Sequence, residues 1–253
     1  MTNKLKYFIG NWKMFGDFGD FKIIHKINKF NYESRKLLKK KKIALCVPNT
    51  LIHFYKKKLV SKFISLGVQN CHYHEGYGSF TGSVSASMLK KAGAEYIILG
   101  HSENRREGES NKLIKKKIIS ALRQKLNVIF CIGETLYEKR KNKTFSILRK
   151  QMKNSLIKNL NINKIIIAYE PVWSIGTNKI PKMDELKIIV KFIKNEFKKI
   201  LRIKKYPKVL YGGSVNNKNI KLFSPLSEID GFLVGGASQS SKKFIDIVKN
   251  YYK

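Results

Sequence analysis

Eight short apolar runs, each bounded by turn residues, constrain the architecture of this chain more than any other feature. The runs lie at residues 7–10, 43–47, 65–68, 96–99, 128–132, 165–169, 209–211 and 231–234. Each is short and apolar like a buried strand, and residues 165–167 are three consecutive isoleucines. A (β/α)8 barrel typically needs about 250 residues, and this chain has 253.

Between several of these runs the apolar residues step by three or four, which is the spacing of an amphipathic helix. The three clearest sets are Phe145, Leu148, Met152, Leu156 and Leu160; Leu186, Ile189, Val190, Ile193 and Phe197; and Phe244, Ile247, Val248 and Tyr251. Over 17–42 and 216–226 the pattern predicts only short or irregular helices. Alternating strands and helices favour parallel pairing. Since no linker divides the chain, we predict an α/β fold with a single (β/α)8 barrel domain, residues 1–253.

Polar residues and glycines gather directly after the predicted strands. They are Asn11 and Lys13 after the first strand, His101 after the fourth, Glu170 after the sixth, Ser214 after the seventh, and Gly235 and Gly236 after the eighth. In a (β/α)8 barrel the residues after the strands encircle the active-site mouth. Their convergence predicts an enzyme.

Two glycine pairs follow the last two predicted strands, in residues 211–215 (YGGSV) and 234–237 (VGGA). Glycine lets backbone N–H groups approach an anion closely, and a helix start behind the pair favours negative charge. Either pair alone is typical of a turn. Together, in the last two loops of a barrel, they predict a phosphate site.

Glu170 stands where the sixth predicted strand breaks at Pro171. Proline pushes the preceding residue into an extended conformation, so Glu170 is held on the strand side of the break. Residues 172–178 then read as a lid that moves as a unit, and a held base beside a movable cover indicates chemistry shielded from water. The alternative is an ordinary connection whose glutamate caps a neighbouring group.

The formal net charge of +35 is extreme. Such a field attracts anionic ligands, and at low salt also nucleic acid. The lysines are dispersed in short clusters such as 39–42, 56–58 and 115–117, which resembles drift under AT-rich coding and predicts no specific nucleic-acid partner. A basic nucleic-acid-binding protein stays an alternative. No apolar run reaches the roughly 20 residues of a membrane span, and the N-terminus lacks a signal-peptide pattern, so we expect no membrane partner.

The cysteines are Cys46, Cys71 and Cys131, an odd number without CxxC spacing, and two of them lie in predicted strands. We interpret them as core residues in a reducing, cytoplasmic protein. His72 and His74 share one face of an extended segment, but no carboxylate or cysteine cluster completes a metal site. We therefore expect no bound metal.

Short motifs are distributed over essentially the whole chain, at residues 11–14 (NWKM), 69–70 (QN), 80–82 (FTG), 99–103 (LGHSE), 130–135 (FCIGET), 168–173 (AYEPVW), 175–177 (IGT), 211–215 (YGGSV) and 231–237 (GFLVGGA). In this order they resemble the motifs of the triosephosphate isomerase family. The resemblance implies a cofactor-independent enzyme of glycolysis and gluconeogenesis that interconverts dihydroxyacetone phosphate and glyceraldehyde 3-phosphate through an enediolate. Barrel architecture alone leaves another phosphate-binding barrel isomerase open.

The resemblance also implies the roles of the residues in these motifs. Glu170 is the base, and His101 is a neutral electrophile because it stands at the start of a helix, a tuning already known for this family. Lys13 neutralises the charge of the substrate, with Asn11 beside it as a donor. Glu103 fixes Lys13 or shuttles a proton.

The same resemblance places the phosphate on the backbone N–H groups of Gly176, Ser214, Gly235 and Gly236. The lid then retains the enediolate, which otherwise expels phosphate.

The chain departs from the family pattern at several positions. Ser174 and Asn178 stand in the lid where alanine and glycine are usual. Pro181 replaces a small residue at the second hinge of the lid and narrows the φ range there, which bears on the rates at which the lid opens and closes. Asn104 replaces an arginine, and we expect Arg105 to substitute for the lost ion pair.

Residues 76–85 resemble the loop that inserts into a partner subunit in this family, with Thr81 at its tip near the partner subunit's Asn11 and Lys13. The loop keeps the FTG motif but has Ser83 and Ala86 where glutamate and proline are usual. The resemblance implies a homodimer.

Overall fold

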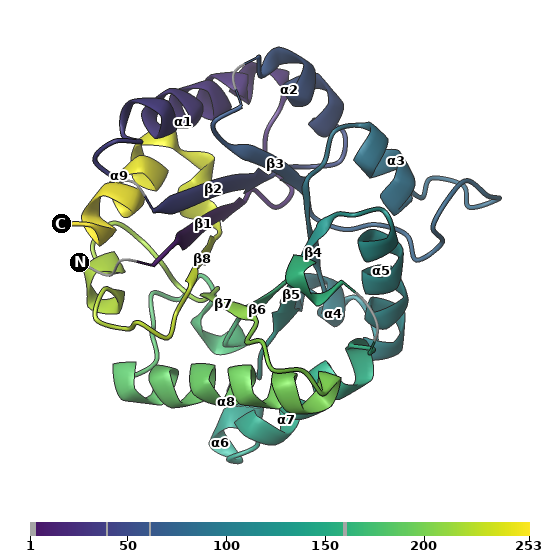
Figure 1. The fold of residues 1–253 in the computed structure, drawn as a ribbon, viewed down its shortest axis with the longest axis vertical. Helices are drawn as coiled ribbons and strands as arrows, with labels where there is room; N and C mark the ends of the chain where they lie inside the picture. Colours follow the sequence, from purple (N-terminus) through teal and green to yellow (C-terminus); the bar gives the residue numbers. More distant parts are fainter. Residues whose placement is uncertain (1–3, 39, 61, 159–160) are drawn as a thin grey trace.

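A computed structural model describes residues 4–38, 40–60, 62–158 and 161–253, and it confirms the predicted barrel. All eight strands pair in parallel and in chain order, and the eighth closes on the first (Figure 1). The strands are β1 Lys6–Asn11, β2 Lys41–Cys46, β3 Ser65–Val68, β4 Tyr96–Leu99, β5 Asn127–Ile132, β6 Ile165–Tyr169, β7 Lys208–Tyr211 and β8 Gly231–Val234. Four of them have the predicted bounds.

The helices surround the barrel (Figure 1). The α-helices are α1 Phe21–Glu33, α2 Ile52–Lys58, α3 Ala86–Lys91, α4 Ser102–Arg106, α5 Asn111–Arg123, α6 Leu136–Arg140, α7 Thr144–Ser155, α8 Met183–Leu201 and α9 Ser241–Tyr251. The 3₁₀ turns are η1 Phe18–Asp20, η2 Ile162–Lys164, η3 Val172–Ser174, η4 Ile220–Phe223 and η5 Gly236–Gln239.

Two of the predicted apolar stripes coincide with the buried faces of α8 and α9. The third stripe was predicted to stay helical too far toward its C-terminal end, because α7 stops at Ser155 and Leu156 is extended at φ −98° and ψ 150°. Leu156 still packs in the core, so the apolar spacing continues after the backbone has changed direction. Leu160, the last residue of that stripe, and Lys39 of the first lysine cluster lie outside the described residues.

The segment 17–42 contains a regular 13-residue helix, α1, so the expectation of a short or irregular helix there was wrong. Its buried face mixes Ile24, Ile27 and Phe30 with Asn28, whose side chain accepts a hydrogen bond from the backbone N–H of Phe63. The polar residue within the stripe weakens the helical pattern. Over 216–226 the structure contains the short turn η4, as expected.

The core has two layers. Side chains on one face of the strands fill the barrel: Ile9, Ala44, Cys46, Tyr96, Ile98, Ile129, Cys131, Ile166, Ala168, Leu210 and Leu233. The opposite faces pack against the helices, and burial of each large apolar side chain contributes roughly 1.5–3 kcal/mol. Closing the barrel needs Gly231, because a Cβ there would lie 2.0 Å from the carbonyl oxygen of Tyr7.

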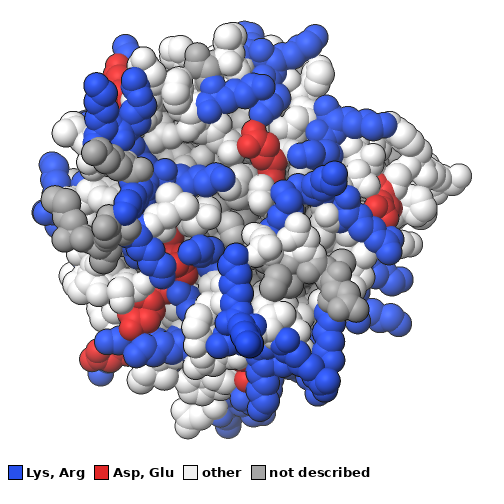
Figure 2. Space-filling view, in the orientation of Figure 1, with Lys and Arg blue, Asp and Glu red and all other residues white. Residues whose placement is uncertain are grey.

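Lysine and arginine cover much of the face shown in Figure 2, with few acidic side chains among them. The basic residues are spread over the visible surface and form no single stripe. No helix in the described part of the chain has both the length and the apolar character needed to cross a bilayer.

Candidate active site

A cavity of about 240 Å³ opens at the carboxyl ends of the strands. It is lined by eight of the residues predicted from the sequence: Asn11, Lys13, His101, Glu170, Gly176, Ser214, Gly235 and Gly236. The ninth, Glu103, lines an adjoining cavity. The carboxyl ends of parallel barrel strands share one end of the barrel, which is why residues up to 225 positions apart meet here.

Glu170 lies directly after β6 and is 2% exposed. Its backbone N–H donates to the carbonyl of Ile132 at 2.8 Å. Burial raises the pKa of its carboxyl, although His101 and a hydrogen bond from the Cys131 thiol oppose the shift. A buried carboxylate with a raised pKa is a better base than one in water.

Two glycines, to which the sequence analysis assigned no role here, hold Glu170 in place. A Cβ at Gly133 would lie 1.7 Å from the carbonyl oxygen of Glu170, and one at Gly212 would lie 2.8 Å from its Cγ. Only glycine permits these approaches. Gly133 belongs to the 130–135 motif and Gly212 to the 211–215 motif, so the motifs named both positions without indicating this contact.

His101 caps the start of α4, as predicted, and its Nδ1 accepts a hydrogen bond from the backbone N–H of Glu103 at 3.2 Å. A ring nitrogen that accepts carries no proton, so the proton of the neutral ring is on Nε2. Nε2 lies 3.3 Å from Glu170 Oε1. The N–H of the imidazole and the carboxylate therefore face the same space.

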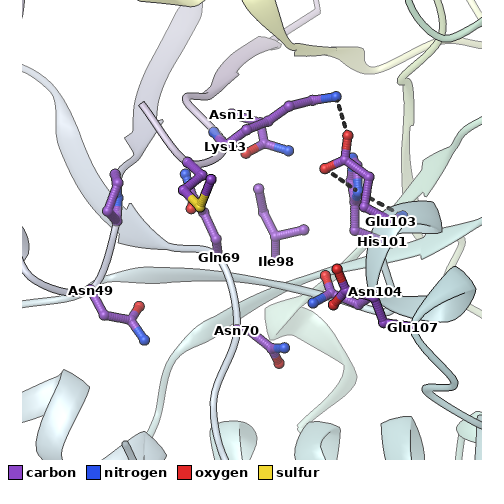
Figure 3. A pocket seen from close by; sticks show the side chains of 12 residues that line it. Asn11, Lys13, Asn49, Gln69, Asn70, Ile98, His101, Glu103, Asn104 and Glu107 are labelled. Atoms are coloured by element: carbon purple, nitrogen blue, oxygen red, sulfur yellow. Dashed lines mark hydrogen bonds and ion pairs between the residues drawn. The ribbon is translucent and has the colours of Figure 1, made fainter. Parts of the chain in front are cut away.

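Lys13 follows β1 and reaches across to α4, where its Nζ lies 2.5 Å from Glu103 Oε1 (Figure 3). Although burial opposes it, this contact lowers the pKa of Glu103 below its usual value. Lys13 also has φ 57°, a left-handed conformation that costs a non-glycine residue roughly 1–3 kcal/mol. Its backbone N–H donates to Asn11 Oδ1 at 3.0 Å, which steadies that conformation.

The glycines of the last two loops leave backbone open to the cavity. A Cβ at Gly236 or Gly176 would meet nothing within 4 Å, and Gly236 opens the turn η5. Ser238 Oγ donates to the carbonyl of Gly235 at 2.7 Å and holds that turn. N–H groups at such a turn are suited to an anion.

The first half of the lid is anchored by Glu134, to which the sequence analysis gave no role. Its buried carboxylate accepts hydrogen bonds from the indole N–H of Trp173 at 2.9 Å and from the hydroxyl of Tyr169 at 3.2 Å. Lys139 lies with its Nζ 4.1 Å from the centre of the Trp173 ring. These contacts tie η3 to the loop after β5.

Ser174 joins the lid to the loop after β7. Its Oγ donates to the carbonyl of Lys179 at 2.5 Å, lies 3.0 Å from the hydroxyl of Tyr211, and accepts from the backbone N–H of Ser214 at 3.2 Å. Ser174 is fully buried. A lid residue thus occupies one of the N–H groups predicted to bind phosphate.

The lid has two left-handed positions, Gly176 at φ 70° and Asn178 at φ 60°. Asparagine tolerates this conformation better than most side chains, which accounts for Asn178 where glycine is usual.

Arg105 was expected to replace an ion pair lost with Asn104. Its guanidinium instead donates to the carbonyls of Gly100 at 2.7 Å and Cys131 at 3.1 Å, and to the side chain of Asn111. Arg105 therefore ties α4 to the barrel mainly through backbone oxygens. Asn104 lines the adjoining cavity.

That adjoining cavity, of about 320 Å³, lies beside Lys13 (Figure 3). Its wall includes Asn11, Lys13, Gln69, Asn70, His101, Glu103 and Glu107. The segment between β3 and α3 extends away from the barrel (Figure 1), and Thr81 on it is exposed.

His72 and His74 do not meet a set of metal ligands. The backbone N–H of His74 donates to His72 Nδ1 at 3.1 Å, and both rings pack on Phe80. Within the described residues, no three His, Cys, Asp or Glu side chains are grouped as a metal ion needs.

The comparisons with known proteins all point to the same family. The profile of the family described as triosephosphate isomerase matches residues 6–251. The triosephosphate isomerases of Dictyoglomus turgidum and Thermodesulfovibrio yellowstonii are each 39% identical, over 97% and 96% of this chain and 99% and 98% of theirs. The crystal structure of triosephosphate isomerase from Bartonella henselae superposes with a TM-score of 0.86 at 33% identity, covering 98% of this chain and 99% of that one.

Proposed function

The chain belongs to the triosephosphate isomerase family, and from this premise we propose that it interconverts dihydroxyacetone phosphate and glyceraldehyde 3-phosphate in glycolysis and gluconeogenesis. The observation that carries the proposal is the meeting of Lys13, His101 and Glu170 around one cavity that also contains the glycine turns. A base, a neutral donor and a cation are the groups that an enediolate reaction requires.

Proton transfer is assigned to Glu170. Its carboxylate takes the proton from the carbon beside the substrate carbonyl, leaving an enediolate, and the resulting carboxylic acid returns the proton to the neighbouring carbon. The raised pKa favours the first transfer, while the contacts at Gly133 and Gly212 keep the carboxyl within reach of both carbons. One carboxyl group therefore serves both carbon atoms, and no second base is needed to move the proton between them.

Stabilisation of the negative charge that develops on the substrate oxygens is assigned to His101 and Lys13. The Nε2–H of His101 already faces the cavity, so it donates to the substrate oxygens without a change of tautomer. Lys13 adds positive charge to the same space. Its ion pair with Glu103 orients the ammonium group, which favours the positioning role for Glu103 over the proton shuttle.

The phosphate is assigned to the backbone N–H groups of Gly176, Ser214, Gly235 and Gly236. Gly176 belongs to the lid, so phosphate binding links the lid to the fixed loops after β7 and β8. A covered site excludes water from the enediolate and prevents loss of phosphate.

A coupled assay on purified protein tests the proposal. We expect isomerisation of glyceraldehyde 3-phosphate by the parent, with no added cofactor. His101→Gln lowers kcat, and Lys13→Ala chiefly abolishes substrate binding. A parent without isomerase activity would refute the proposed function.

We further propose a homodimer in which the loop around Thr81 enters the cavity beside the partner subunit's Lys13. In support, large apolar side chains near both parts are exposed, including Met14 at 93%, Phe15 and Tyr77. Light scattering of the parent and of Phe15→Asp tests this pairing. A monomeric parent at micromolar concentration would contradict it.

A cytoplasmic location is part of the same proposal. Cys46, Cys71 and Cys131 are buried free thiols, which suits a reducing compartment.

A further inference from the structure

A third cavity, of about 320 Å³, lies at the opposite end of the barrel from Glu170. Tyr7, Lys42, Tyr96 and Lys208 line it, and each is the first or second residue of its strand. Lys205, just before β7, completes the charged part of the wall. Since the reacting groups follow the strands, this cavity is separated from them by the filled interior of the barrel.

Two tyrosines, Tyr7 and Tyr96, line this cavity. Tyr96 is 2% exposed and belongs to the barrel interior, and Tyr7 packs against the same cluster. No hydrogen bond joins either hydroxyl to a residue in the described part of the chain. Burial raises the pKa of both tyrosines, so each hydroxyl keeps its proton and can donate it to a ligand.

The charged groups on the cavity wall are all cationic. Among the described residues, Lys42 forms no ion pair, and its Nζ lies 5.7 Å from the centre of the Tyr96 ring. Lys205 Nζ donates to the neutral side chain of Asn163 at 2.7 Å. No aspartate or glutamate of the described chain lines the cavity. Two of its three ammonium groups are therefore not neutralised by a direct ion pair.

The third ammonium group is only weakly neutralised. Lys208 Nζ lies 3.8 Å from Asp230, whose carboxylate also pairs with Lys4 at 2.8 Å and Lys194 at 2.7 Å. Glu95, beside the cavity, is engaged by Lys56 and Ser65. The nearby carboxylates are thus already bound by side chains outside the cavity.

Lysine and arginine make up 52 of 253 residues, so lysines alone do not mark a site in this protein. The independent observation is that Tyr7 and Tyr96 line the cavity and that the described chain supplies no hydrogen-bond partner for either hydroxyl. Ammonium and phenol groups all donate hydrogen bonds, and a ligand that satisfies them together must be rich in acceptors and carry several negative charges.

We propose that this cavity binds a small multivalent anion bearing phosphate groups. Lys42, Lys205 and Lys208 neutralise its charge, while Tyr7 and Tyr96 donate to its oxygens from the floor of the cavity. Because such a ligand binds the folded chain and relieves repulsion in a protein of net charge +35, it raises the thermal stability of the barrel.

Pyrophosphate is the probe, titrated by calorimetry in 0.15 M KCl to suppress nonspecific attraction. Every chain in this titration carries Lys13→Ala, which weakens anion binding at the catalytic cavity and leaves the third cavity intact. We expect saturable one-to-one binding and a higher Tm. Lys42→Ala with Lys205→Ala weakens the binding by about tenfold or more, and Tyr96→Phe, which keeps the ring, weakens it several-fold.

The matched control is Lys22→Ala with Lys243→Ala, which removes the same charge from exposed positions on α1 and α9. This control retains parental affinity. Equal losses in the two double variants would overturn the proposal, since they would show attraction by net charge alone. Absence of saturable binding would also overturn it. Neither result bears on isomerisation, which is measured separately in the chain with Lys13 intact.

Discussion

Ser174→Ala is the perturbation that most directly tests how the lid and the phosphate site are coupled. In the structure the backbone N–H of Ser214 donates to Ser174 Oγ at 3.2 Å, yet that N–H is proposed to bind the phosphate of the substrate. The phosphate must therefore displace Ser174. Alanine removes the competing oxygen.

The size of the effect follows from the contacts of the hydroxyl. One hydrogen bond contributes a net of roughly 0.5–1.5 kcal/mol, so freeing the N–H of Ser214 lowers KM about two- to tenfold. The same change leaves the buried hydroxyl of Tyr211 without Ser174, its one hydrogen-bond partner in the described chain. An unsatisfied buried hydroxyl costs about 1–3 kcal/mol, and Tm falls by roughly 2–10 °C.

Steady-state kinetics by the coupled assay, together with thermal unfolding, measure both effects. Tyr211→Phe added to Ser174→Ala removes the unsatisfied hydroxyl, so it recovers the stability lost at Tyr211 while the lower KM persists. Ser155→Ala is the matched control. Ser155, at the end of α7, is 1% exposed, and its hydroxyl donates to the carbonyl of Asn111 at 3.3 Å. It lowers Tm without changing KM.

An unchanged or higher KM in Ser174→Ala, with Ser155→Ala behaving as expected, would refute the reasoning. The contact of Ser174 with Ser214 would then be no obstacle to phosphate binding.

Three further predictions concern the base and the lid. Glu170→Asp withdraws the carboxylate by one methylene and lowers kcat far more than it changes KM, because the loss falls on the transition state; near-parental kcat in the coupled assay would exclude Glu170 as the base. Burial raises the pKa of Glu170 above its ordinary value of 4.5, so the folded protein binds this proton more tightly than the unfolded chain and ionisation of Glu170 destabilises the fold as pH rises through that range. Glu170→Gln is therefore more stable than the parent at pH 7.5, and the difference in Tm closes toward pH 4; a constant difference across that range would contradict the assignment. Pro181 limits φ at the second hinge of the lid, so Pro181→Ala turns over faster, and unchanged kcat with unchanged loop relaxation by NMR would remove this role.

The barrel was predictable because its strands are buried on both faces. A strand such as β6 is continuous apolar sequence, and its observed bounds of Ile165–Tyr169 are those predicted. Helix ends were less predictable. Leu156 continues the apolar spacing of α7 while its backbone is extended, because burial depends on where a side chain lies and not on the helix to which it belongs.

The positions of the candidate site residues were also predictable, since residues after parallel strands share one end of a barrel. Their partners were not. Glu134 binds Trp173 from 39 residues away, and Gly133 leaves room for the backbone of Glu170. No periodic pattern marks either contact, because both depend on how two loops approach each other in space.

What the sequence by itself determined is the order of strands and helices and the end of the barrel at which the polar residues gather. Only the tertiary structure decided which atoms meet, such as Glu134 with Trp173 and Ser174 with Ser214. The physical reason is that hydrophobic periodicity reports which faces of each element are buried. Hydrogen bonds and ion pairs instead require two groups within about 3–4 Å, and barrel closure sets those separations.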